Sequence, residues 1–222
     1  EVIGTAPHVT HVAGLYMMIL QHELMFFADT TVNIKPDAET LAEIALLSAQ
    51  FVRRLGIQPH LAMLSFSNFG SSRHPESDKV RGAGALLQAR HPDLIVDGEM
   101  QADSAVVPEI LQRSFPFSRL QQQANVLIFP DLDSANIAYK LLWRLGGAEA
   151  IGPILLGMAR PGHVLQRGSE AADILNLTAI AVVGAHKRGE DGQSGKRADG
   201  QSGTPETTTV ARKRKTGVRG SA

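Results

Sequence analysis

The segment LSFSNFGSSRHPESDKV, from Leu64 to Val80, has the residue types and the order of an anion-binding loop. An apolar stretch runs into a loop rich in serine and glycine, and the proline at position 75 suits the first turn of a helix. Small residues let backbone N–H groups gather around an oxyanion, and serine hydroxyls add further donors. A plain connecting loop with a solvated lysine is the alternative. The pattern predicts a phosphate site made by Ser65, Ser67, Gly70, Ser71 and Lys79.

Three further blocks follow this loop in order: DGEMQADSA at 97–105, FPDLDSANIAYKLLWRLGG at 129–147 and GPILLGMARP at 152–161. With them the chain, over Val2 to Ala185, resembles the phosphate acetyl/butyryltransferase family, whose members move an acyl group between coenzyme A and phosphate. The loop SNFGS and the segment FFADTTVN at 26–33 are most similar to the acetyltransferase-like C-terminal region of bacterial hybrid NADP-dependent malic enzymes.

The resemblance also implies a catalytic group within LQRGSEAADILN, residues 165–176. In the transferase reaction a carboxylate can remove the thiol proton of coenzyme A, and an arginine can stabilise charge on the carbonyl oxygen and the departing phosphate. Asp173 matches the base of the family, and Arg167 matches its arginine, which also makes it a phosphate ligand. Gln166 stands where the family has a serine. Because an amide is longer than a hydroxyl, this difference puts full transferase activity in doubt. A solvated carboxylate near a helix start is the alternative for Asp173.

Coenzyme A contacts are predicted at Asn136, Lys140, Asp103 and Asp173. Asn136 and Lys140 lie one helical turn apart, so both can face a cleft, although both could equally be ordinary surface residues. The carboxylates of Asp97, Glu99 and Asp103 could bind a cation or orient the coenzyme A arm. The simpler alternative is that these three residues cap the next helix and face solvent.

Metal and nucleotide motifs are missing from the sequence. Its eight histidines include no HExxH element, so we expect no metal site, and the glycines form neither a dinucleotide fingerprint nor a Walker loop. We expect no tightly bound cofactor, with acetyl-CoA or coenzyme A as ligand or substrate.

Alternating apolar segments and helical periods predict the elements that must position these residues. Strands are expected at 14–20, 25–32, 60–66, 94–96 and 126–129. Helices are expected at 38–55, between an Asp37 cap and Gly56, and at 75–90. A third helix should start with Asp133 and Ser134 as caps, and a fourth should span 170–185. The third is expected to bury Ile137, Leu141, Leu142 and Leu145.

These elements indicate an α/β fold with three layers, α/β/α, around a mainly parallel sheet. Only QHEL separates the first two strands, so they should pair as a hairpin and make the sheet mixed. The resemblance implies a two-lobed architecture in which part of the N-terminal lobe is missing here, and Glu1 is interpreted as a cut edge.

Composition separates a body, 1–185, from a tail, 186–222. Of the charged residues, the body has 13 Lys/Arg against 18 Asp/Glu, and the tail has 9 against 4. The tail repeats DGQSG and contains ARKRK, so we expect it to be disordered. It has no aromatic residue for stacking on bases, which argues against a nucleic-acid partner. The chain has no cysteine and no apolar run long enough to span a membrane, and we expect a cytoplasmic protein.

Three hypotheses follow from the resemblance. The first is a module that binds acetyl-CoA and regulates and assembles a hybrid malic enzyme, with an upstream malic enzyme domain as partner and a homo-oligomeric state. The second is an active phosphate acetyltransferase or butyryltransferase that uses phosphate or acetyl phosphate. The third is a module that serves assembly alone.

Overall fold

The computed structural model describes residues 3–21 and 23–198. The chain divides into two compact units, Glu1–Lys187 and Arg188–Ala222. The described part of the second unit, 188–198, is the end of helix α6 (Ala171–Ala198). This helix passes its predicted end near Ala185, and the rest of the predicted tail lies outside the described residues.

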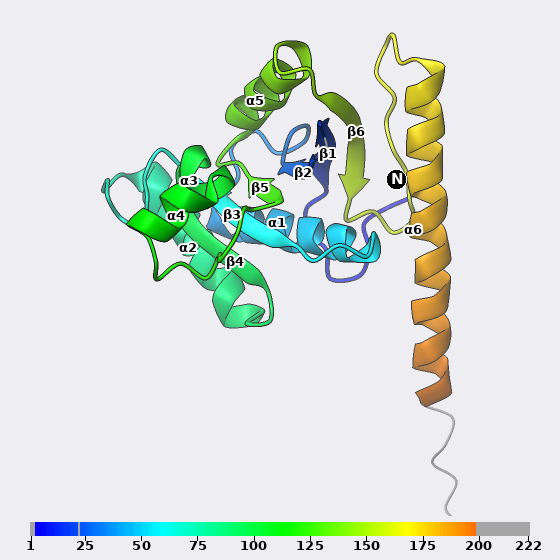
Figure 1. Cartoon of the computed structure of the whole chain (residues 1–222). Coiled ribbons are helices and arrows are strands. Elements are labelled where there is room, and N and C mark those ends of the chain that lie inside the picture. The colour runs from blue at the N-terminus through cyan, green and yellow to red at the C-terminus, as the bar shows by residue number, and fades with distance from the viewer. Residues whose placement is uncertain (1–2, 22, 199–222) are drawn as a thin grey trace, which may run out of the picture. The chain divides into compact units, whose positions relative to one another are not determined.

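The first unit contains a six-stranded sheet (Figure 1). Its strands are β1 (Ala13–Leu20), β2 (Glu23–Ala28), β3 (His60–Leu64), β4 (Ile95–Met100), β5 (Val126–Ile128) and β6 (Glu149–Leu156). Their order is β4-β3-β5-β2-β1-β6. β1 pairs antiparallel with β2 and β6, and the other pairs are parallel. The predicted hairpin and the mixed, mainly parallel sheet are therefore confirmed.

Several strand predictions differ from the structure. β3 ends at Leu64 instead of residue 66, and β4 runs to Met100 instead of ending at residue 96. β2 ends at Ala28 instead of residue 32, because the buried carboxylate of Asp29 accepts hydrogen bonds from the backbone N–H groups of Thr31, Val32 and Asn33 and folds them into a turn. β6 was not predicted, since Gly152 and Pro153 interrupt its apolar pattern.

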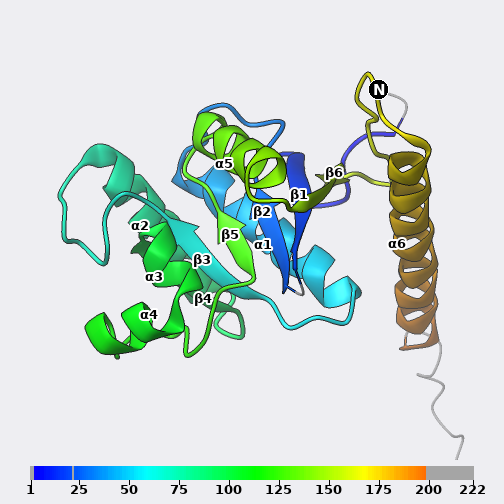
Figure 2. The ribbon, with the colours of Figure 1, turned by 45° about the horizontal axis from the view of Figure 1, so that its top comes forward.

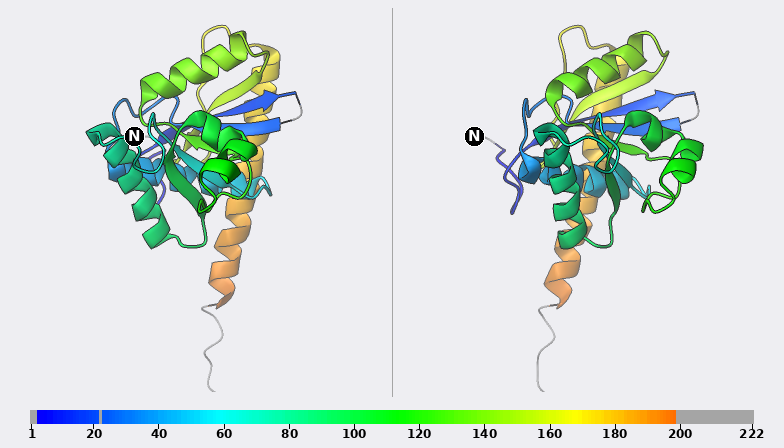
Figure 3. Two further views of the ribbon diagram at one scale, coloured as in Figure 1. Left: turned by 60° about the vertical axis from the view of Figure 1, so that its left-hand side comes forward. Right: turned by 90° about the vertical axis from the view of Figure 1, so that its left-hand side faces the viewer.

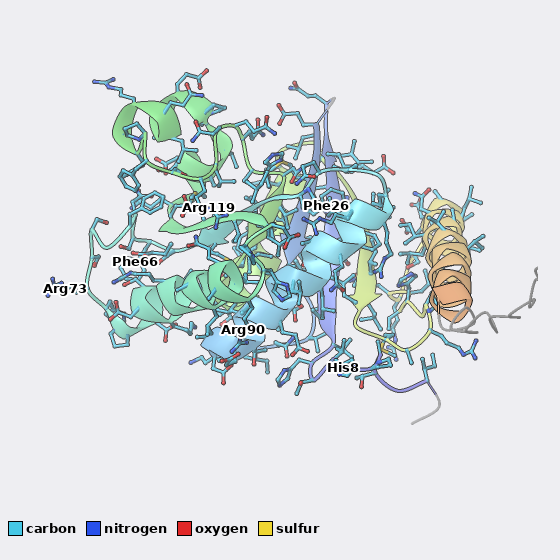
Figure 4. The ribbon with its side chains drawn as sticks, turned by 90° about the horizontal axis from the view of Figure 1, so that it is seen from below. His8, Phe26, Phe66, Arg73, Arg90 and Arg119 are labelled. Carbon is cyan, nitrogen blue, oxygen red and sulfur yellow. The ribbon has the colours of Figure 1, made fainter. Side chains whose placement is uncertain are left out.

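Helices cover both faces of the sheet (Figures 1 and 2). They are α1 (Ala38–Arg54), α2 (Pro75–Arg90), α3 (Ala102–Val106), α4 (Pro108–Ser114) and α5 (Leu132–Arg144). α1 and α2 pack on one face, where Phe26 lies beneath α1 and meets the edge of Phe51 with 6.3 Å between ring centroids (Figure 4). α3, α4 and α5 contribute to a second apolar cluster on the opposite face. The predicted three-layer arrangement is thus confirmed.

The ends of α1 and α2 follow from local chemistry. Asp37 caps α1 as predicted, because its carboxylate accepts the N–H of Thr40 at 2.8 Å. Arg90, at the end of α2, makes two hydrogen bonds to the carboxylate of Glu39 and joins the two helices (Figure 4).

α5 turns a different face to the sheet from the one predicted. Asp131, two residues before the predicted cap Asp133, accepts the N–H of Ser134 and starts the helix. Its buried side chains are Ala135 and Tyr139, with Leu142 partly buried. The remaining members of the predicted apolar face are exposed: Ile137, Leu141 and Leu145. The helix has two apolar stripes, and the fold covers the one with the aromatic ring.

Within the described residues, none of the helices is both long and apolar enough to cross a membrane.

Candidate active site

A pocket of about 210 Å³ brings together the catalytic residues predicted from the sequence. We call it the α5–β6 pocket, because these two elements, β1, the turn before α6 and the first turn of α6 contribute its lining residues. Figure 3 shows the ribbon of these elements from two further sides. Gln166, Arg167, Asp173 and Lys140 all line it. Its other lining residues are Tyr16, Trp143, Arg144, Ala150, Gly152, Gly168 and Ser169.

A tight turn presents Gln166 and Arg167 to this pocket. The carbonyl of Gln166 accepts hydrogen bonds from both the backbone N–H and the hydroxyl of Ser169, at 3.1 and 2.9 Å. Gly168 has a φ of 86°, in the left-handed region that glycine adopts without a steric penalty. The glycine therefore allows the chain to reverse directly after Arg167.

The side chain of Gln166 is tied to the sheet. Its Nε2 donates to the hydroxyl of Tyr16 at 2.7 Å. The ring of Tyr16 is buried and stacks on Tyr139, with 4.2 Å between centroids. Burial raises the pKa of the Tyr16 hydroxyl well above its usual value, and Tyr139 and the nearby Asp173 carboxylate add to this increase. Tyr16 therefore stays protonated at neutral pH.

Asp173 lies in the first turn of α6, where its carboxylate accepts the backbone N–H of Glu170 at 2.9 Å. This is the contact expected of a carboxylate at a helix start. The same side chain borders the α5–β6 pocket, so Asp173 is both a helix-terminal group and a pocket group.

Positive charge predominates in the pocket lining. Lys140, Arg144 and Arg167 line it together with one carboxylate, that of Asp173. The guanidinium of Arg144 lies over the ring of Trp143, 3.6 Å from its centroid, which restricts its orientation. The arrangement suits an anionic ligand, because arginine and lysine donate charge-assisted hydrogen bonds to phosphate and carboxylate oxygens.

The serine-rich loop surrounds a carboxylate of the chain itself. The hydroxyl of Ser67 and the N–H of Gly70 both donate to Oε1 of Glu99, at 2.9 and 2.7 Å. Arg81 donates to the other oxygen, Oε2, at 2.9 Å. The donors predicted for phosphate at Ser67 and Gly70 are thus engaged by Glu99, and the hydroxyl of Ser71 accepts the N–H of Asn68.

Glu99 is fully buried and ionised. Burial opposes its ionisation, but the hydrogen bonds from Arg81, Gly70 and Ser67 outweigh that effect and hold the pKa of the carboxyl below its usual value. The simpler prediction for the three carboxylates, that they face solvent, is wrong for Glu99. It is also wrong for Asp97, which is buried and accepts from the hydroxyl of Ser118 and the N–H of Arg119. Both residues lie within strand β4 (Ile95–Met100), and the helix that follows, α3, begins only at Ala102.

Ser65 and Lys79 meet in a second pocket of about 350 Å³, which we call the β3–β5 pocket because it opens beyond the ends of these strands. Lys79 donates to Glu76 at 2.6 Å and to the carbonyl of Pro130 at 3.1 Å. Its amine is thereby held at the carboxyl ends of parallel strands, where α/β folds bind ligands. The other lining residues are Lys35, Phe66, Glu76, Pro130 and Asp131, and Phe66 is labelled in Figure 4.

The remaining predicted residues lie elsewhere. Asn136 is on α5 and donates to the carbonyl of Thr30 at 3.4 Å. Asp103 is exposed in the first turn of α3, where it accepts the N–H of Ser104. Asn136 and Asp103 are not among the residues that line the α5–β6 pocket. Among the described residues, no three His, Asp or Glu side chains are grouped so that they could hold a metal ion.

Tyr16 and Arg144 are pocket residues that sequence reasoning missed. In the sequence, Tyr16 cannot be told apart from the apolar residues of the strand around it. Its hydrogen bond to Gln166 joins residues 150 positions apart, so no local pattern predicts it. Arg144 had a detectable signal, since it lies one turn after Lys140 on the same helix.

Comparisons with known proteins identify the family of the chain. Residues 1–182 match the family model for phosphate acetyl/butaryl transferase. The chain is 42% identical over 194 residues to phosphate acetyltransferase of Clostridium acetobutylicum, an alignment that covers 84% of this chain and 58% of that protein. It is 46% identical over 178 residues to NADP-dependent malic enzyme of Escherichia coli, covering 79% of this chain and 23% of the enzyme.

The fold matches solved structures as well. The phosphotransacetylase from Streptococcus pyogenes superposes with a TM-score of 0.79 at 44% identity, covering 82% of this chain and 56% of that one. EutD phosphotransacetylase from Staphylococcus aureus gives a TM-score of 0.78 at 39% identity, with 81% and 56% covered. The chain therefore spans less than two thirds of the length of these relatives. It belongs to the phosphate acetyl/butaryl transferase family.

Proposed function

We propose that this chain binds acetyl-CoA or coenzyme A and serves as the regulatory and assembly region of a hybrid NADP-dependent malic enzyme. The observation that carries the proposal is the hydrogen bond from Gln166, at the position where the resemblance implies a serine, to the hydroxyl of the buried Tyr16. The malic enzyme relative supports the same assignment.

In this proposal the α5–β6 pocket holds the anionic part of the ligand. Arg167, Arg144 and Lys140 supply positive charge for phosphate oxygens. Ser65 and Lys79 of the β3–β5 pocket remain proposed phosphate contacts, while Asn136 and Asp103 remain proposed coenzyme A contacts outside the two pockets.

Regulation requires that the ligand bind two states of the whole protein with different affinity. Acetyl-CoA bound to this region would favour the less active state of an upstream malic enzyme domain. We propose that the protein works in the cytoplasm and that the module associates with further copies of itself. We propose no nucleic-acid partner.

An active transferase is the second candidate, favoured by the presence of Asp173 and Arg167 in one pocket. Asp173 would take the thiol proton of coenzyme A, and the sulfur would form a bond to the acetyl carbon of acetyl phosphate. The bond from that carbon to the phosphate oxygen would then break, and inorganic phosphate would leave. Arg167 would stabilise the charge on the carbonyl or phosphate oxygens.

One experiment separates the two functions. Acetyl-CoA is titrated calorimetrically into the longest natural form of the protein, and turnover of acetyl phosphate with coenzyme A is assayed on the same sample. The regulatory function predicts binding without acyl transfer, together with a change in malate turnover. Transfer that disappears in Asp173→Asn would establish the enzyme instead, and absence of binding would contradict both.

The binding site has its own test. Arg167→Ala should weaken acetyl-CoA binding by about 10- to 100-fold, because a charge-assisted phosphate contact is lost. Arg160→Ala is the matched control, since this exposed arginine is not among the residues that line the pocket. Equal effects of the two substitutions would place the ligand elsewhere.

A further inference from the structure

Part of the lining of the α5–β6 pocket is uncharged and has no role in the anion binding proposed above. Tyr16 and Trp143 contribute aromatic rings, while Ala150 and Gly152 contribute a small side chain and bare backbone. They come from β1, α5 and β6, and α5 leads into β6 through a short connection (Figure 1). Sites for small molecules typically combine such an apolar surface with a few polar or charged groups that orient the ligand. The pocket therefore suits a ligand that joins an anion to a short apolar group.

The ring of Tyr16 forms a fixed wall of this apolar part. It stacks on Tyr139 with 4.2 Å between centroids, and its hydroxyl accepts the hydrogen bond from Gln166. It also lies against the backbone of β6, since a Cβ added at Gly152 would come within 2.7 Å of the ring. Because closely packed side chains give way only at a cost in free energy, the ring sets a firm limit to the space beside it.

Trp143 bounds the same space from the helix. It lies one turn after Tyr139 on α5, so both side chains project from one side of the helix. The indole is partly buried against the apolar cluster that contains Tyr16, and the guanidinium of Arg144 covers one of its faces at 3.6 Å from the centroid. The size of this side chain therefore helps to set how much apolar space the pocket has.

The volume of the pocket limits the ligand as well. It is about 210 Å³, less than the roughly 300 Å³ at which sites for drug-sized ligands begin. The cationic side chains and the apolar part share this volume, so a bound phosphate group leaves room for only a short apolar chain. A small acyl phosphate has this composition, because it joins a phosphate directly to an acyl group.

We propose that Trp143 determines which acyl phosphates the α5–β6 pocket accepts, favouring acetyl and propionyl phosphate over butyryl phosphate. The phosphate lies on the cationic side chains, and the acyl chain lies against Ala150 between the rings of Tyr16 and Trp143. A longer chain meets the fixed ring of Tyr16 on one side and the indole on the other. The inference deepens the proposed function, since it rests on the anion-binding role of this pocket and names the acyl group that the site selects.

The test measures the dissociation constants of inorganic, acetyl, propionyl and butyryl phosphate for the full chain by phosphorus NMR titration. We expect wild type to bind butyryl phosphate at least about 10-fold more weakly than acetyl phosphate, because a single methylene group in a tight pocket changes affinity by about that factor or more. In Trp143→Ala the two constants should become equal, since the longer chain then has room. Inorganic phosphate has no acyl chain, so it separates the effect of the lost stacking on Arg144 from the effect of pocket size.

A second variant changes the same space from the opposite side. Ala150→Val narrows it from β6, where valine suits a strand. It should weaken the binding of propionyl phosphate by about 10-fold and leave acetyl phosphate little changed. Phe117→Ala is the matched control, since this aromatic residue is 67% exposed and is not among the residues that line the pocket. Circular dichroism of each variant checks that the fold is retained.

An equal preference for acetyl over butyryl phosphate in wild type and Trp143→Ala would overturn the role of Trp143, as would equal affinity of wild type for the two ligands. If acetyl-CoA binds but no acyl phosphate does, the inference fails and the proposed function stands. If acyl phosphates are selected through Trp143 but acetyl-CoA does not bind, the coenzyme A function is rejected and the inference stands.

Discussion

The side-chain amide of Gln166 donates to the hydroxyl of Tyr16, with 2.7 Å between Nε2 and Oη. Tyr16 lies in the middle of β1, and its ring is held by stacking on Tyr139. The contact thus fixes one of the two amide donors of Gln166 against the sheet. The same contact anchors the turn that carries Arg167.

Tyr16→Phe removes this hydrogen bond but keeps the stacked ring. We expect the free energy of unfolding to fall by about 1 kcal/mol, measured by denaturant titration. A cycle with Gln166→Ala and the double variant isolates the contact, and a coupling energy near zero would contradict it.

Gln166→Ser places a hydroxyl in the lining of the α5–β6 pocket, at the position where the resemblance implies a serine. If Gln166 is what suppresses acyl transfer, turnover of acetyl phosphate should rise by about 10-fold or more, because a small donor can then reach the reacting oxygen. Gln166→Ala is the control, as it removes the amide without supplying a hydroxyl. Equal turnover in wild type and both variants would show that other residues limit the reaction.

Glu99→Gln should destabilise the protein at neutral pH by about 1–3 kcal/mol, since a buried acceptor of three hydrogen bonds is altered. The folded state holds the pKa of Glu99 below its unfolded value of about 4.3, so the stability that it supplies is present above that pH. It is lost as pH falls through the folded pKa. Unfolding free energies of both proteins from about pH 7 to about pH 3 should therefore converge in acid. A constant difference across this range would contradict the assignment.

His163 should make the fold sensitive to mild acid. Its Nδ1 accepts the N–H of Leu155 at 3.2 Å, and burial lowers the pKa of the ring. The unfolded chain binds the proton first, so stability falls as pH drops below about 6.5 toward the folded pKa. His163→Asn keeps an acceptor and cannot titrate, and thermal unfolding should show a weaker pH dependence in this variant. Burial also lowers the pKa of His60. Because wild type and His163→Asn both contain His60, its effect cancels when the pH dependence of their stabilities is compared.

Much of the fold could be predicted because it depends on residues that are close together in the sequence. The alternation of strands and helices, the Asp37 cap of α1, the hairpin of β1 and β2, and the start of α2 at Pro75 all depend on residues close together in the chain. The predicted catalytic group also meets in one pocket, since Gln166, Arg167 and Asp173 belong to one turn and the helix that follows.

The tertiary structure decided what depends on distant partners. The sequence contains two apolar stripes on α5. The stripe that is buried is the one with Ala135 and Tyr139, which pack in the cluster on the sheet, with Tyr139 stacked on Tyr16. An anion cradle is visible in the serine loop, but its occupant, Glu99, comes from β4 about thirty residues later. In both cases the local sequence shows which side chains can be buried or can donate hydrogen bonds. Which residues they contact depends on the elements that the sheet places next to them.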